Sequence, residues 1–232
     1  MSERFGQTAI LVFTRTPVQE AVSKTFDPNT GKNGNQAIAH RLIRQTVATA
    51  RSTRLPVFVY YDKPNKLESF GVHLAQAFES VFAKGFSKVI AVGNDCPDLS
   101  VDLILRASSR LSEQKLVLGP ATDGGVYLIG MHQIAYERHA FIDLPWETAQ
   151  LQAGWKQYLA VNPLGIVWLE SFSDIDHPAD FKALLNRLPQ WSLLKKQLLS
   201  VLASMQIPLA FDRWDIPPVA LICATPLRGP PL

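Results

Sequence analysis

Hydrophobic residues in the first half of the chain fall into two alternating patterns. Continuous apolar runs at residues 9–14, 56–60 and 88–92 are typical of strands buried on both faces of a parallel sheet. Between and after these runs, apolar residues recur every three or four positions, which predicts amphipathic helices. The predicted helices cover residues 35–53, 67–84 and 100–111.

The second half continues the alternation. Two short apolar runs, 116–118 and 126–129, flank the turn sequence GPATDGG and predict a pair of strands. A further strand is predicted at 164–169. Helices are predicted at 145–159, 179–188 and 190–205, followed by a proline-rich tail. Alternating strands and helices predict an α/β three-layer sandwich around a mostly parallel, Rossmann-like sheet.

The chain length sets the expected domain organisation. A chain of 232 residues suits one α/β domain with an appendage. We expect the main domain at residues 1–188 and a C-terminal helical and proline-rich extension at 189–232 that packs on it. Residues 15–33 read as a polar loop, and a connection of that length inside a compact domain is either mobile or functional.

Composition and charge narrow the possible classes of protein. Hydrophobic residues make up 47% of the chain and the net charge is +3, so a large core is expected and nucleic-acid binding is not. Two cysteines form neither a disulfide framework nor a thiolate zinc site. The sequence predicts no signal peptide and no membrane span, so a cytoplasmic protein is expected. The sequence does not reveal the oligomeric state.

Ligands of open α/β sheets bind at the carboxyl ends of the strands, where this chain places polar loops. Asp95 and Asp98 follow the third strand in GNDCPDLS. Asp95 is a candidate ligand for Mg²⁺ or Mn²⁺, which prefer oxygen ligands. Asp98 could instead cap the helix that begins near Ser100. Cys96 is a poor nucleophile candidate because the neighbouring carboxylates raise the pKa of a thiol.

A second acidic pair, Asp174 and Asp176, follows the last predicted strand in SDIDHP. We expect only one of the two carboxylates to reach a shared site. The alternative is that both acids favour the N-terminus of the following helix through its dipole.

Cations and glycines provide further candidates. Arg15, Lys24 and Lys32 follow the first strand, where they could bind a diphosphate or simply be solvated. The glycine-rich phosphate fingerprints GxGxxG and GxxxxGK[ST] are both absent from the sequence. The Asp123-Gly124-Gly125 sequence is a turn signal, and its glycines could let the backbone approach a ligand closely.

Five segments, taken together, resemble one family. They are FTRTPVQEAVSKTF, VIAVGNDCPDLS, LVLGPATDGGVYLIGM, LPWET and SDIDHPADF. The set resembles a bacterial family of proposed GT-A fold glycosyltransferases, related to nucleotide-diphospho-sugar transferases and to the guanylyltransferase for the molybdenum cofactor. The resemblance covers roughly residues 8–188.

The resemblance implies a nucleotide-sugar domain with a divalent metal. Asp95 and Asp176 match the metal ligands of the pattern. Arg15 and Lys24 match its diphosphate-binding cations. Asp123, with Gly124 and Gly125, matches its sugar or acceptor region, and Asp123 is the candidate base. The first loop departs from the family pattern, because Gln19 and Glu20 replace a Pro-Gly pair. A second departure lies outside this loop, where His73 replaces a common arginine.

Three hypotheses follow for the function. The first is a metal-dependent glycosyltransferase that uses a nucleotide sugar and an unknown acceptor. The second is a nucleotidyltransferase that makes a nucleotide sugar or a related conjugate. The third is a degenerate domain that binds a nucleotide or a partner without catalysis, which the altered first loop favours.

Overall fold

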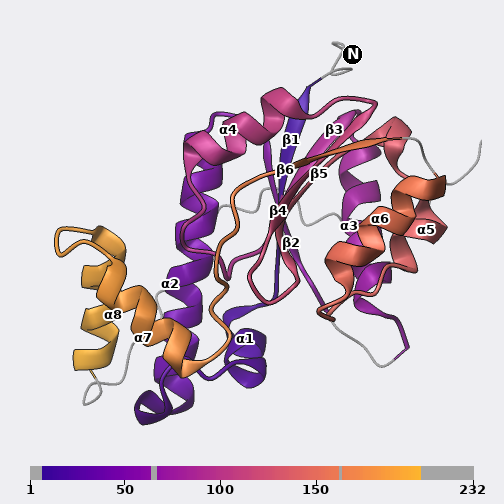
Figure 1. Ribbon diagram of the computed structural model, residues 1–232. Coiled ribbons are helices and arrows are strands. Elements are labelled where there is room, and N and C mark those ends of the chain that lie inside the picture. The colour runs from indigo at the N-terminus through magenta and orange to yellow at the C-terminus, as the bar shows by residue number, and fades with distance from the viewer. Residues whose placement is uncertain (1–6, 64–66, 162–163, 205–232) are drawn as a thin grey trace, which may run out of the picture.

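The computed structural model describes residues 7–63, 67–161 and 164–204. Six strands form one sheet in the order β2-β1-β3-β5-β4-β6 (Figure 1). The strands are β1 (Thr8–Thr14), β2 (Val57–Tyr61), β3 (Lys88–Val92), β4 (Lys115–Pro120), β5 (Val126–His132) and β6 (Gly165–Trp168). The predicted strands are therefore all present, with ends that differ by a few residues.

The sheet is mixed rather than wholly parallel. β1 pairs in parallel with β2 and β3, and β4 pairs in parallel with β6. β5 lies between β3 and β4 and runs antiparallel to both. The short turn between β4 and β5 makes an antiparallel hairpin, since parallel neighbours need a longer crossover. The other five strands consequently point the same way, and their carboxyl ends share one edge of the sheet.

Helices cover both faces of the sheet and give the three predicted layers (Figure 1). On one face lie α3 (Phe70–Phe82), α5 (Arg138–Ile142) and α6 (Leu151–Val161). On the other lie α2 (Gly31–Ser52) and α4 (Val101–Arg110). No helix of the described residues is both long and apolar enough to cross a membrane.

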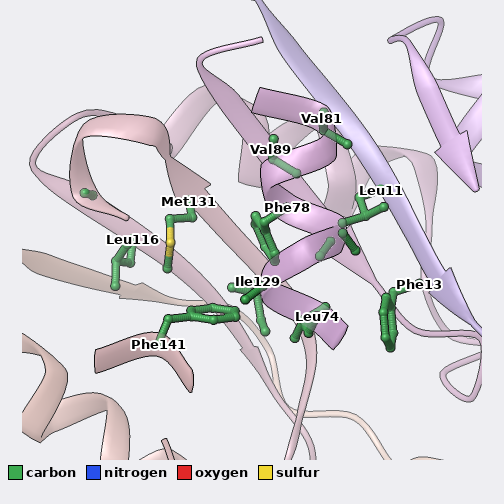
Figure 2. Close-up of a cluster of buried hydrophobic side chains, with 14 of the residues drawn as sticks. Leu11, Phe13, Leu74, Phe78, Val81, Val89, Leu116, Ile129, Met131 and Phe141 are labelled. Carbon is green, nitrogen blue, oxygen red and sulfur yellow. The ribbon is translucent and has the colours of Figure 1, made fainter. Parts of the chain in front are cut away.

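Each face of the sheet has its own hydrophobic core, because neighbouring strand residues point to opposite faces. In β1, Leu11 and Phe13 face α3, whereas Ile10 and Val12 face α2 and α4. Figure 2 shows the α3 side, where Phe78 lies among strand residues of β1, β3, β4 and β5. All seven residues of β1 are buried, as its continuous apolar run predicts.

A third hydrophobic cluster joins the C-terminal helices to the main body. α7 (Pro178–Arg187) and α8 (Leu193–Ala203) pack beside α2 (Figure 1). Leu198 of α8 and Leu184 of α7 are both fully buried in this cluster with Ile38 of α2. The predicted extension begins inside this region, and the proline-rich tail beyond Ser204 lies outside the described residues.

The prediction of a polar loop at residues 15–33 is wrong. This segment contains α1 (Pro17–Ser23) and the short 3₁₀ helix η1 (Pro28–Thr30), and α2 begins at Gly31, directly after η1. α1 starts at a capping box in which Thr16 and Gln19 satisfy each other's backbone amides, with Pro17 in the first turn. Gln19, a departure from the family pattern, therefore has a helix-capping role.

The helix predicted at 145–159 also differs from the structure. The regular helix α6 begins only at Leu151, and residues 145–150 form turns. Glu147 explains part of this, since its φ of 57° is left-handed and cannot continue an α-helix. The short helix α5 between residues 138 and 142 was not predicted.

Candidate active site

A pocket of about 380 Å³ opens at the edge where the five parallel strands end. Its walls come from the segments after β1, β2, β3 and β6 and from the start of β5. The charged residues that line it are Arg15, Glu20, Lys24, Asp62, Asp95, Glu147, Asp174 and Asp176. The pocket therefore lies where α/β sheets bind ligands.

Two contacts bring the loop before α7 against the loop after β3. The Ile175 amide donates a hydrogen bond of 2.9 Å to the Asp95 carbonyl oxygen. The Arg187 guanidinium, at the end of α7, pairs with the Asp98 carboxylate. Asp98 is thus an anchor for α7, and the cap of α4 is instead the Ser100 hydroxyl, which accepts from the Leu103 amide.

Lys24 joins the two predicted metal ligands. Its Nζ lies 2.9 Å from Asp95 Oδ2 and 2.7 Å from Asp176 Oδ1. Burial opposes the charge on Lys24, but the two carboxylates outweigh burial and raise the pKa of its ammonium. Burial likewise opposes the charge on Asp95, and Lys24 outweighs it, so the pKa of Asp95 is lowered. The three side chains form one charged cluster.

Asp174 also reaches the pocket, so the expectation that only one of the two acids would do so is wrong. The loop is tied down through Ile175, and the carboxylates on either side both turn inward. Asp174 Oδ1 is buried and has no hydrogen-bond partner among the described residues. Burial, with the nearby carboxylates of Asp95 and Asp123, raises the pKa of Asp174 to about 8.

Arg15 is the second cation that lines the pocket. Its Nε is 3.9 Å from Asp62 Oδ2, and its other end is 3.6 Å from Glu147 Oε1. Asp62 is only 2% exposed and also contacts His73, whose Nδ1 lies 2.8 Å from Asp62 Oδ1. His73 thus supports, from behind the wall, the carboxylate that holds Arg15.

The segment containing Trp146 and Glu147 is a part of the site that the residue-level reasoning missed. Both residues line the pocket, and the Trp146 indole donates to the Phe141 carbonyl oxygen at 2.8 Å. A left-handed non-glycine residue such as Glu147 costs about 1–3 kcal/mol and is common at functional sites. The available signal was the LPWET motif, which contains both residues.

Glu20 is a second residue of the pocket to which the sequence analysis assigned no function. It lies on α1, is 5% exposed and lines the pocket. Its Oε2 has no hydrogen-bond partner among the described residues, and burial raises the pKa of its carboxyl. Lys24 follows the end of α1, four residues after Glu20, and its charge partly offsets the effect of burial on the pKa of Glu20.

The Asp123–Gly125 turn lies at the rim. Gly125 lines the pocket, whereas Asp123 is exposed, does not line it, and accepts a 2.8 Å hydrogen bond from the Gly125 amide. Gly124 has a φ of +100°, and a β-carbon there would lie 2.6 Å from the Ala149 carbonyl oxygen. The structure therefore gives Gly124 a packing role that is independent of any ligand.

The remaining candidates lie away from the open pocket. Cys96 is 1% exposed, and burial, with the carboxylates of Asp174 and Asp95, raises the pKa of its thiol. It therefore lacks the exposure and thiolate character of a nucleophile. Lys32 is exposed on α2 and does not line the pocket.

The part of the pocket wall away from the charged residues is apolar. Phe13 contacts Phe70 edge-on at 5.5 Å between ring centroids, and Phe70 lies 5.7 Å from Trp146. Leu74 and Leu151 extend this wall. The pocket consequently offers an ionic end and an aromatic end, as pockets for small organic ligands commonly do.

The donor set fits a divalent cation. Asp95 and Asp176 each place a carboxylate oxygen within 3 Å of the Lys24 nitrogen, so a cation already occupies the point between them. Mg²⁺ commonly takes one or two carboxylates and completes its shell with water and phosphate oxygens. The described residues contain no cluster of three or more histidine, cysteine or acidic side chains arranged to bind a metal unaided.

Sequence comparisons with known proteins give one partial family match. A family profile described as an uncharacterized protein conserved in bacteria (DUF2064) matches residues 36–148, just under half of the chain. No curated protein matches the sequence at a significant level. The predicted kinship with the molybdenum-cofactor guanylyltransferase stays a prediction.

Solved structures give a clearer fold relationship. A candidate nucleotide-diphospho-sugar transferase from Desulfovibrio desulfuricans G20 has a TM-score of 0.72 at 18% identity, over 88% of this chain and 97% of that one. A nucleotidyl transferase from Methanothermobacter thermautotrophicus has a TM-score of 0.43 at 12% identity, over 84% and 98%. The first similarity confirms a GT-A-like α/β fold; the second is too low to support an argument.

Proposed function

We propose that the protein is a metal-dependent transferase that uses a nucleotide-activated sugar. The observation that supports this most is the cluster of Lys24, Asp95 and Asp176 inside a pocket at the strand ends. Carboxylates for a divalent ion and cations for a diphosphate are what such a reaction needs at one place. The fold shared with the D. desulfuricans protein is consistent with this chemistry.

Asp95 and Asp176 would hold Mg²⁺ or Mn²⁺ in this proposal. The bound ion supplies positive charge that stabilises a leaving diphosphate. Lys24 and Arg15, which both line the pocket, bind phosphate oxygens and keep the diphosphate in place. Asp123 and the two glycines after it, at the rim, contact the sugar or the acceptor.

The charge of the pocket supports a role for a metal. Six carboxylates line it, against the two cations Arg15 and Lys24. Even with Asp174 protonated, acidic groups outnumber basic ones, so a diphosphate alone would enter a negative field. A divalent cation offsets this repulsion, and the nucleotide sugar should therefore bind far better with the metal than without it.

Thermal unfolding against a panel of nucleotide sugars and nucleotides, with and without MnCl₂, tests the proposal. At a concentration about 100-fold above the Kd, a true ligand should raise Tm by about 5 °C or more, and only with Mn²⁺ present. The Asp95→Asn variant should lose the shift. The control variant Asp102→Asn, whose carboxylate is 82% exposed on α4, should keep it.

Two other outcomes point to the alternatives. Release of pyrophosphate from a nucleoside triphosphate and a sugar phosphate would show a nucleotidyltransferase instead. A metal-dependent nucleotide shift without any transfer or release would favour a binding domain. If no compound in the panel shifts Tm in the presence of Mn²⁺, the proposed function is wrong.

A further inference from the structure

The Lys24 ammonium occupies the point that a divalent ion would need. It lies 2.9 Å and 2.7 Å from the two carboxylate oxygens of Asp95 and Asp176, and the Lys24 side chain is only 16% exposed. No solvent-mediated arrangement is needed to explain these distances, because both are direct charge-assisted contacts. The cation between the two carboxylates therefore belongs to the chain itself.

Two cations cannot share this point. Mg²⁺ requires oxygen ligands at about 2.0–2.1 Å, so an ion held by both carboxylates would lie in the space of the Lys24 nitrogen. A displaced ammonium that stayed nearby would also repel the ion, since like charges a few ångströms apart interact strongly in a half-buried site. Lys24 must consequently move before a metal can bind both carboxylates.

The structure offers a counter-charge for the displaced side chain. Glu20 lies one turn earlier on the same chain segment, is 5% exposed, and has a carboxylate oxygen without a hydrogen-bond partner among the described residues. A lysine side chain is long and flexible enough to change partners without a change in the backbone. Phosphate oxygens of a ligand in the pocket would be a second destination.

We propose that Lys24 competes with the divalent ion for Asp95 and Asp176, and that its displacement frees the ammonium to bind the phosphates of the substrate. The second part, binding of substrate phosphates, rests on the proposed function. The first part, competition between Lys24 and the metal ion, does not depend on it. The metal and the diphosphate then assist each other's binding, because each favours the state in which Lys24 has left the carboxylates.

The competition predicts opposite effects of one substitution. Lys24→Met keeps the length of the side chain and removes its charge, so the carboxylates lose their internal cation. Without any nucleotide, Lys24→Met should bind Mn²⁺ about tenfold more tightly than the wild type in a calorimetric titration. With saturating Mn²⁺, the same variant should bind UDP or GDP about tenfold more weakly, because one phosphate ligand is missing.

Matched variants identify the site and the cause. Lys24→Arg keeps a cation and should bind Mn²⁺ like the wild type. Lys195→Met removes a half-buried lysine on α8 whose Nζ donates to the Leu188 carbonyl oxygen, and should also be unchanged. Asp95→Asn should abolish the tight binding. Circular dichroism checks folding, and Lys24→Met without metal should melt earlier and regain its Tm with Mn²⁺.

The outcomes separate this inference from the proposed function. Equal or weaker Mn²⁺ binding by folded Lys24→Met would overturn the competition, even if nucleotide sugars bind the wild type. Tighter Mn²⁺ binding by Lys24→Met would uphold it, even if no nucleotide sugar is a ligand and the transferase proposal fails. Absence of Mn²⁺ binding to both proteins would overturn the competition as well.

Discussion

Gly124 shows how one residue of a candidate site can be fixed by packing alone. Its left-handed φ of +100° suits glycine, and the space where a β-carbon would stand is taken by the backbone of Ala149, with Cα at 2.8 Å and O at 2.6 Å. Backbone atoms cannot yield as the end of a flexible side chain can. The turn therefore depends on this glycine whether or not a ligand is bound.

We accordingly expect Gly124→Ala to lower the free energy of unfolding by about 2 kcal/mol or more, measured by chemical denaturation. Gly165→Ala is the matched control, because a β-carbon there would have no neighbour closer than 3.6 Å and the residue has no positive φ. The control should change stability by less than about 1 kcal/mol. Equal effects of the two substitutions would contradict the packing role of Gly124.

Sequence reasoning reached some residues of the site and not others. Asp95 and Asp176 were predicted to approach each other, and the structure brings both to one lysine. The bridge itself was not predicted, because Lys24 and Asp95 are 71 positions apart and no local pattern encodes such a contact. The role of Glu147 in the pocket was not predicted for a related reason, since its left-handed backbone conformation is set by the tertiary fold.

At the scale of elements, α7 positions the last part of the site. The helix begins two residues after Asp176, and its far end is tied to the loop after β3 through Arg187 and Asp98. The same loop receives the Ile175 amide at its near end. Two ties at separate points hold the acidic loop in a fixed orientation toward Asp95.

Removal of one tie should loosen the acidic loop. Arg187→Ala should weaken Mn²⁺ binding several-fold in a titration, although Arg187 does not line the pocket. Its effect on overall stability should stay below about 1 kcal/mol, because the pair is more than one-third exposed on each side.

Arg138→Ala removes a comparable surface pair, with Glu79 on the opposite side of the sheet, and is the control. It should leave Mn²⁺ binding unchanged. If Arg187→Ala behaves like this control, the backbone contact of Ile175 alone orients the loop.

The helices and strands differ in how well their local sequence predicts them. Strands such as β3, with residues 88–92 predicted and observed, are defined by their own apolar runs. α1 was missed because seven residues carry little periodicity, and its start depends on a mutual contact between Thr16 and Gln19. The insertion of β5 between β3 and β4 is a choice between tertiary pairings, which strand periodicity does not encode.

At the scale of the whole molecule, three hydrophobic clusters connect the layers. Two lie on the faces of the sheet, and the third joins α2 to α7 and α8. α2 contributes Ile43 to the second cluster and Ile38 to the third. We expect the C-terminal helices to unfold together with the sheet, because one continuous helix belongs to both clusters.

Two neighbouring leucines test this cooperativity. Leu198 is fully buried, and Leu198→Ala should lower the free energy of unfolding by about 2–5 kcal/mol. Leu199 is 45% exposed, and Leu199→Ala should change it by less than about 0.5 kcal/mol. Circular dichroism and tryptophan fluorescence should follow one transition in both variants. Two separate transitions would show that α8 is an independent appendage.

The three-layer architecture was predictable because it follows from the alternation of apolar runs and helical spacings, and the similarity at a TM-score of 0.72 agrees with it. The domain boundary predicted near residue 189 stays a prediction. The contact of Leu198 with the α2 cluster shows why such a boundary is hard to read: a helix looks the same in sequence whichever neighbour buries it.

The hydrogen bond from the Ile175 amide to the Asp95 carbonyl oxygen has a consequence for how such proteins diversify. Both partners are main-chain atoms, so the bond itself requires of residue 175 only an amide hydrogen, which proline lacks. The Ile175 side chain, which is 1% exposed, packs separately in the third hydrophobic cluster. A mutation can then change the side chain at position 174 while the loop keeps its register with the end of β3 and Asp176 stays in place. New substrate preferences can therefore evolve in this loop on an unchanged fold.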